Sequence, residues 1–173
     1  MQQVARLVVA TLLFFSLAQC QTPPTKRADY GKAVISDLDI NHYTDETIEF
    51  TCKDRKEDFD PGYAKIEIKN DTLQIRNWHN DGFTGAEINF HIGKDLTIKK
   101  IEYWDWSDFD DGTTNTIEVM EAEFHINSNP FLKGVNGLKG NYYLKIKEVN
   151  SSRKRSLEKN THIFTIHGII SCP

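Results

Sequence analysis

Apolar and polar residues alternate with a period of two along most of the chain beyond about residue 34. The alternation is clearest at residues 64–68 and 73–75, at residues 86–92 and at residues 142–146. This period is typical of β-strands that bury one face. No apolar pattern at the helical spacing of 3.6 residues extends over ten residues, so at most one short helix is expected. The pattern predicts an all-β domain of about nine strands, either an antiparallel β-sandwich or an up-and-down barrel, with mostly meander connections.

Several local signals refine this picture. Asn70-Asp71 interrupts the alternation inside residues 63–78, and both residue types tolerate the left-handed backbone of a tight hairpin. The parity of the apolar positions breaks near Lys99-Lys100 and again between Val119 and Met120. Two β-bulges would repair these breaks and would curve the sheet strongly. Residues 161–171 are apolar at both parities, which predicts a central strand.

The N-terminus has a different character from the rest of the chain. One positive charge at Arg6 precedes an apolar run at residues 7–17, and Leu17-Ala18-Gln19-Cys20 follows. This is the pattern of a secretory signal, and its end resembles the lipobox of bacterial lipoproteins. The resemblance implies that Cys20 is the lipidated N-terminus of the mature chain. Gln19 departs from the small residue that is usual before the cysteine, and the alternative is a plain secretory signal cut after Cys20.

The apolar run is too short to span a bilayer as a helix, so export rather than a retained anchor is expected. The expected organisation is a signal peptide at residues 1–19, a lipidated cysteine with a Pro-containing tether at residues 20–31, and an all-β domain at residues 32–173. Gln21, rather than Asp, follows the cysteine, which by the same resemblance favours the outer membrane. The expected location is the bacterial cell envelope, anchored by lipid and facing the periplasm, with secretion as the alternative.

Two cysteines remain once Cys20 is assigned to lipid. Cys52 and Cys172 both fall at inward positions of their strands, and an exported protein lies in a compartment that permits disulfides. Their bond would close a loop of 120 residues and tie the second strand to the last. Neither cysteine has the Cys-x-x-Cys spacing of a metal or redox site.

The charge of the chain limits its partners. The full chain carries 21 Lys and Arg against 25 Asp and Glu, and removal of the signal removes one Arg. A net negative domain argues against nucleic acid as a partner, because phosphate binding requires a basic face. The basic run at residues 153–155 is flanked by serines and is interpreted as a solvated loop.

The densest group of unusual side chains lies at residues 103–112. Tyr103, Trp104 and Trp106 are the predicted ligand-binding residues, and on a strand the two tryptophans point the same way. If they point inward, the favoured interpretation, they form core or line a cavity. If they point outward, they form a platform for a sugar ring or another flat ligand. Trp78 joins them only if the strand ends converge.

Other candidate chemistry is weak. Four aspartates, at positions 105, 108, 110 and 111, suggest calcium, but their spacing does not fit an EF-hand loop. The six histidines lack the spacing of zinc ligands, and no nucleophile motif or phosphate-binding glycine loop occurs. The sequence therefore predicts no catalytic residue, no metal and no cofactor.

The resulting hypothesis is an exported, lipid-anchored, non-enzymatic binding module that holds a small apolar or flat ligand in the manner of a lipocalin. The first alternative is a protein-interaction, inhibitor or immunity-type lipoprotein that uses the acidic loops at residues 54–60 and 108–112. The second is an envelope hydrolase, which requires a carboxylate or histidine pair in a cleft with Trp104 or Trp106. A cavity of several hundred Å³ lined by the tryptophans would favour the small ligand.

Overall fold

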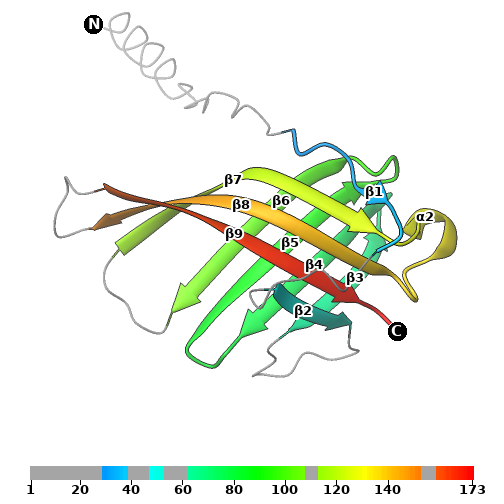
Figure 1. Ribbon diagram of the computed structural model, residues 1–173, viewed down its shortest axis with the longest axis horizontal. Coiled ribbons are helices and arrows are strands. Elements are labelled where there is room, and N and C mark those ends of the chain that lie inside the picture. The colour runs from blue at the N-terminus through cyan, green and yellow to red at the C-terminus, as the bar shows by residue number, and fades with distance from the viewer. Residues whose placement is uncertain (1–28, 39–46, 53–61, 108–112, 153–158) are drawn as a thin grey trace, which may run out of the picture.

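The computed structural model describes residues 29–38, 47–52, 62–107, 113–152 and 159–173. In this part of the chain nine strands form one sheet, accompanied by one short helix (Figure 1). The all-β prediction is confirmed. The elements are β1 (Val34–Ile35), β2 (Thr47–Cys52), β3 (Tyr63–Lys69), β4 (Thr72–Asn80), β5 (Thr84–Gly93), β6 (Ile98–Ser107), β7 (Thr113–Ile126), α2 (Pro130–Lys133), β8 (Lys139–Ser152) and β9 (Lys159–Ser171).

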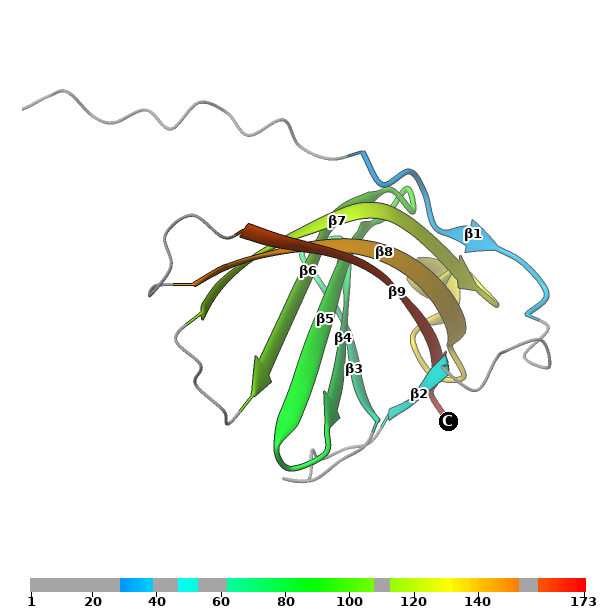
Figure 2. The same cartoon turned by 60° about the vertical axis from the view of Figure 1, so that its left-hand side comes forward.

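The sheet curls on itself into a half-barrel, as Figure 2 shows. The strand order is β1-β7-β8-β9-β2-β3-β4-β5-β6. The antiparallel meanders β3–β6 and β7–β9 are joined by β2, which pairs in parallel with both β9 and β3. The sheet is therefore mixed, whereas the alternation suggested antiparallel pairing throughout. The apolar pattern sets which face is buried, but it carries no information on strand direction.

The predicted turn and bulges are present. Asn70 and Asp71 both have positive φ, 51° and 54°, and connect β3 to β4 as a two-residue hairpin. The register of β5 against β6 shifts at His91/Ile92 and leaves Lys99 as the extra residue. The register of β7 against β8 shifts between Val119 and Glu121, so Met120 is the extra residue there. These bulges bend the sheet and help it to curl. The last strand, β9, is central as predicted.

The core fills the inside of the curl. Phe90, Phe124 and Tyr142 form its aromatic centre, and the Phe90 ring centroid lies 4.8 Å from that of Phe124 and 4.9 Å from that of Tyr142. Aliphatic side chains from β4, β5, β7 and β8 surround these rings. Burial of this apolar surface is the main driving force for the curled shape.

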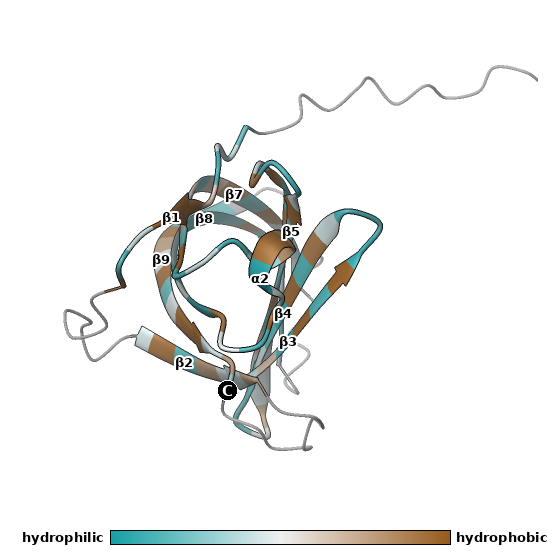
Figure 3. Cartoon of the chain, turned by 90° about the vertical axis from the view of Figure 1, so that its right-hand side faces the viewer, coloured by the Kyte–Doolittle hydropathy of each residue, from teal (hydrophilic) through white to brown (hydrophobic). Residues whose placement is uncertain are grey.

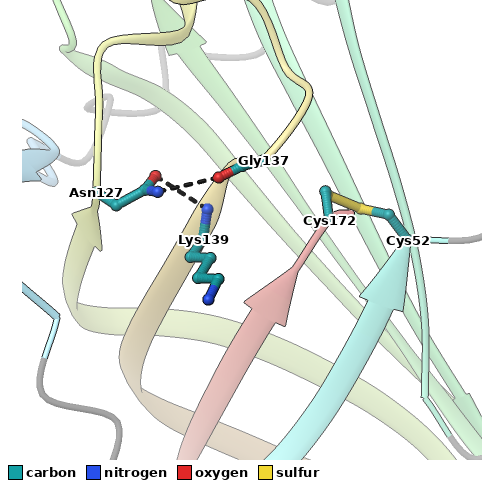
Figure 4. Close-up of a disulfide and its surroundings, with 5 residues drawn as sticks. All are labelled: Cys52, Asn127, Gly137, Lys139 and Cys172. Atoms are coloured by element: carbon teal, nitrogen blue, oxygen red, sulfur yellow. Dashed lines mark hydrogen bonds between the residues drawn. A yellow bond between two sulfur atoms is a disulfide. The ribbon is translucent and has the colours of Figure 1, made fainter.

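One end of the half-barrel carries the helix α2 (Figure 3). Asn129 caps the helix by accepting a hydrogen bond from the Phe131 amide, and Pro130 begins it. Asn127 holds the following loop, because its side chain donates to the Gly137 carbonyl and accepts from the Lys139 amide (Figure 4). Leu138 is buried in the core below this loop.

The disulfide lies at the same end. Cys52, the last residue of β2, is bonded to Cys172, just beyond β9, with a Cα–Cα distance of 4.6 Å (Figure 4). The predicted pairing is confirmed. It fixes β2 to β9 at the point where the two meanders meet.

The segment that contains β1 contacts both β7, near one end of the strand order, and the start of β6, the strand at the other end. Val34 and Ile35 pair in parallel with His125 and Ile126 of β7. Lys32, just before them, forms a bridge with Thr97, and the Ile98 amide donates to the Gly31 carbonyl. This segment thus links β7 to the start of β6.

Some sequence predictions fall outside the described residues. They are the signal peptide, the lipobox and the lipidated Cys20, the acidic loops at residues 54–60 and 108–112, and the basic run at residues 153–155.

Candidate functional site

The pairing of β5 with β6 decides where the predicted ligand-binding residues point. Tyr103 pairs with the buried Ile88 and therefore faces the inside of the half-barrel. Trp104 pairs with Glu87 and Trp106 with Gly85, on the opposite, outer face. The favoured interior position of the two tryptophans is wrong, because Trp104 is 46% exposed. The three residues do not line a single interior cavity.

Trp106 and Trp78 converge on the outer face. The Trp106 ring lies over Gly85, where a Cβ would come within 1.9 Å of a ring carbon. Because glycine leaves this space free, the indole can cross β5 and approach Trp78, with ring centroids 4.6 Å apart. The condition under which Trp78 joins the cluster is therefore met.

A hollow of about 420 Å³ is lined by residues from the ends of β4 and β6 and the starts of β5 and β7. These strand ends form the open end of the half-barrel, opposite the end that carries α2 (Figure 1). Tyr103 and Trp106 supply its aromatic wall, and Asp105 lies between them in sequence. The remaining lining residues come from β4, β5, β6 and β7: His79, Thr84, Gly85, Ala86, Ser107 and Asn115. We call this hollow the open-end pocket. It combines aromatic surface with a carboxylate and several hydrogen-bonding groups.

Negative charge gathers around Tyr103. Its ring packs edge-on against Phe164 across the interior, with centroids 6.0 Å apart. Burial raises the pKa of Tyr103, and the Asp105 and Glu148 carboxylates raise it further. Tyr103 therefore stays protonated and can donate a hydrogen bond. The two carboxylates favour a ligand with hydrogen-bond donors or positive charge.

Another polar side chain lies in the same cross-strand row as Tyr103, because Asn77 of β4 and Tyr103 of β6 both pair with Ile88 of β5. Asn77 is fully buried on β4, and neither its side-chain oxygen nor its nitrogen reaches a hydrogen-bond partner among the described residues. The Tyr142 hydroxyl is likewise buried without such a partner. Burial raises the pKa of Tyr142. Asn77 and the Tyr142 hydroxyl thus add polar groups to the interior of the half-barrel.

A second hollow of about 400 Å³ follows the seam between β6 and β7. Tyr103 and Trp104 line it from β6, Ile117 and Val119 line it from β7, and Tyr30 lies at its side. Hollows of several hundred Å³ thus lie beside Tyr103 and one or other tryptophan. The criterion set from the sequence, one cavity lined by both tryptophans, is not met among the described residues, because each hollow is lined by Tyr103 and a single tryptophan.

The outer face holds a smaller hollow of about 180 Å³ beside Trp104. His91 and Glu102 lie in it, with His91 Nε2 3.3 Å from Glu102 Oε2. Partial burial works to raise the pKa of Glu102, but hydrogen bonds and charge from Lys100 and His91 outweigh it, so this pKa lies below its ordinary value. The hydrolase hypothesis required such a pair beside Trp104. An ionised Glu102 accepts hydrogen bonds but is a poor proton donor.

Sequence reasoning missed several polar residues of the interior. Asn77 continues the inward parity of Leu73 and Ile75, and Glu148 continues that of Leu144 and Ile146. A polar residue at an inward-facing position of a strand was the only sign of these interior groups in the sequence. That sign indicates a site only when the neighbouring strands are known.

The described residues contain no group of three His, Cys, Asp or Glu side chains that could hold a metal ion. Within the same residues, no helix has the length and apolar character needed to cross a membrane.

The fold and site together define a class of structure, a curled β half-barrel with a polar open end. Comparison of the chain with protein-family models, with curated proteins and with solved structures gives no match. Any function must therefore be inferred from the chemistry of the site itself.

Proposed function

We propose that this protein is an exported, lipid-anchored module of the bacterial envelope that binds a small flat ligand in its open-end pocket without catalysing a reaction. The observation that carries the proposal is the position of Tyr103. It forms part of the wall of a hollow of about 420 Å³, beside Trp106 and Asp105. Aromatic walls with a few placed polar groups are the usual composition of small-molecule sites.

The charge around Tyr103 defines the ligand further. Asp105 lines the open-end pocket, and the Glu148 carboxylate acts on the same hydroxyl from β8. A flat ring can stack on the aromatic wall while an amine on the ring pairs with a carboxylate. The proposed ligand is therefore a flat molecule that carries an amine or another strong hydrogen-bond donor.

The alternative of a protein-interaction module depended on the acidic loops. Both of these loops lie outside the described residues.

Three naphthalene probes test the pocket, because they share one flat ring system and differ in charge. They are 2-naphthylmethylamine, 2-naphthylmethanol and 2-naphthoate, with binding measured by isothermal calorimetry. We expect the amine to bind most tightly and the naphthoate most weakly. Asp105→Asn is expected to weaken the amine by about tenfold while changing the alcohol little, since it removes a charge-assisted contact.

Asp95→Asn is the matched control, because Asp95 lies in the turn between β5 and β6 and its carboxylate bonds to Thr97. It should leave the binding of all three probes unchanged. Tyr103→Ala should weaken all three. The proposal fails if none of the probes binds, or if binding is the same in wild type, Asp105→Asn and Tyr103→Ala.

The lipid anchor has its own test. Cells that express the full chain are grown with an alkyne-labelled fatty acid, and the wild type is compared with Cys20→Ala. We expect label only in the wild type, which should also fractionate with membranes. If the wild type is unlabelled and is released from the cell, the protein is secreted without a lipid anchor.

A further inference from the structure

The outer face of β4, β5 and β6 carries a second set of polar and aromatic side chains in register. Arg76, Asn89 and Glu102 form one row across the three strands, and Trp78, Glu87 and Trp104 form the next. The hollow of about 180 Å³ lies over the first row, with Trp104 at its side. We call it the outer hollow. It shares no lining residue with the open-end pocket.

Asn89 is the unusual residue of the outer hollow. It is only 8% exposed although it belongs to the outer face, and it lines the outer hollow. Its Oδ1 accepts no hydrogen bond from the described residues. A buried acceptor without a donor is costly, so an amide held in this position indicates a site that receives a donor from a ligand.

The charges around Asn89 balance. Arg76 Nε lies 3.0 Å from Glu87 Oε1, and Glu102 is paired with both Lys100 and His91. Lys65 and Glu67, which also line the outer hollow, pair at 3.4 Å. Three cations, Lys65, Arg76 and Lys100, thus meet three carboxylates, and His91 lies beside one of them. Such a site offers donors and acceptors side by side, which suits a neutral ligand with several hydroxyl groups.

Trp104 provides the apolar part of the site. Its indole is 46% exposed and borders the outer hollow. Trp78, in the same row as Trp104, packs against Trp106 of the next row. The C–H face of a sugar ring packs on such a surface while its hydroxyls reach polar groups at the side.

We propose that the outer hollow binds one neutral pyranose ring, stacked on Trp104 and with a hydroxyl donating to Asn89 Oδ1. The volume of about 180 Å³ suits a single ring rather than a large ligand. A stable protein interface covers about 800 Å² on each partner, which is far larger than a hollow of about 180 Å³. The source of the ring, a free sugar or a unit of a glycan, is decided by the probes below.

Binding is measured with the full mature chain by following tryptophan emission during titration. The neutral probes are methyl glucoside, methyl galactoside, methyl mannoside and N-acetylglucosamine, and glucuronate and glucosamine present similar rings with a charge. We expect at least one neutral probe to bind, and each charged probe to bind several-fold more weakly than its neutral counterpart. Tighter binding of an oligosaccharide than of its monomer would assign the site to a glycan, and equal binding would assign it to a free sugar.

Two variants test the contacts. Trp104→Ala should lower sugar affinity at least about tenfold, whereas Met120→Ala, which removes another exposed apolar side chain from β7, should not. Asn89→Leu should also lower affinity at least about tenfold. It should unfold at the same or a higher urea concentration than wild type, because it removes an unsatisfied buried acceptor.

Tyr103→Ala distinguishes this site from the open-end pocket, since it should leave sugar binding unchanged while it weakens the naphthalene probes. The inference is overturned if no neutral sugar binds the wild type. It is equally overturned if sugar binding survives both Trp104→Ala and Asn89→Leu.

Discussion

Single residues set the shape of the site through the space they leave free. Gly85 accepts the Trp106 ring on the outer face, and Gly168 accepts the Tyr142 ring on the inner face. In each case a Cβ would come within about 2 Å of a ring atom, at 1.9 Å for Gly85 and 2.1 Å for Gly168. The two glycines thus allow aromatic rings to cross a neighbouring strand. One ring builds the outer tryptophan pair, and the other completes the core.

Glu102 gives the residue-scale prediction. Its pKa in the folded protein lies below the ordinary value of 4.5. A carboxylate with a lowered pKa stabilises the fold above its unfolded pKa, and this contribution is lost as the pH falls through the folded pKa. Glu102→Gln should therefore lower the free energy of unfolding near pH 7, and its difference from wild type should shrink as the pH falls below 4.5. Urea unfolding near pH 7 and at successively lower pH values measures this. A difference that is equally large in acid would contradict the assigned hydrogen bonds.

At the scale of elements, the sequence pattern and the structure agree closely. The β3–β4 hairpin has its two-residue turn where Asn70-Asp71 interrupts the alternation. The bulges at Lys99 and Met120 occur where the parity of apolar residues breaks. The residue preferences of tight turns and the alternation of apolar and polar residues are local properties of a few residues. Hairpin turns and bulges can therefore be predicted from the sequence without knowledge of the rest of the fold.

The hairpin turn gives the prediction at this scale. Asp71 has φ of 54°, which is costly for β-branched residues and free for glycine. Asp71→Val should lower the free energy of unfolding by about 1–2 kcal/mol, whereas Asp71→Gly should leave it within about 0.5 kcal/mol of wild type. The ion pair of Asp71 with Lys94 is exposed, so its loss in both variants contributes little. Thermal or urea unfolding of the two variants measures the difference. An equal loss of stability in Asp71→Val and Asp71→Gly would contradict the turn geometry.

The whole molecule depends on how two meanders are joined. Strand β2 lies between β9 and β3 and pairs in parallel with both. Within the part of the chain that the structure describes, it shares two residue pairs with β3, Thr51 with Tyr63 and Cys52 with Ala64. The Cys52–Cys172 disulfide lies at this junction. The covalent link and the short parallel pairing together hold the curl of the sheet.

Removal of the disulfide gives the prediction for the whole molecule. The bond spans 120 residues, and for a loop of this size the loss of loop-closure entropy in the unfolded chain amounts to about 4–5 kcal/mol. The double substitution Cys52→Ser with Cys172→Ser should lower the free energy of unfolding by up to this amount. Urea unfolding without reductant measures the effect, and wild type with reductant should approach the double variant. Identical stability of oxidised wild type and the double variant would contradict this role.

The sequence by itself determined the strands, their buried parity, the hairpin turn, the bulges and the disulfide, because each follows from local backbone preference or from a pair of inward cysteines. Only the tertiary structure decided strand direction and order, and with them the two faces of β6. Tyr103 and Trp104 are neighbours in sequence, yet one faces inward and the other outward, and the choice depends on their partners Ile88 and Glu87 on β5. Register across strands is a long-range property, so the open-end pocket and the outer hollow appear only when distant segments pair.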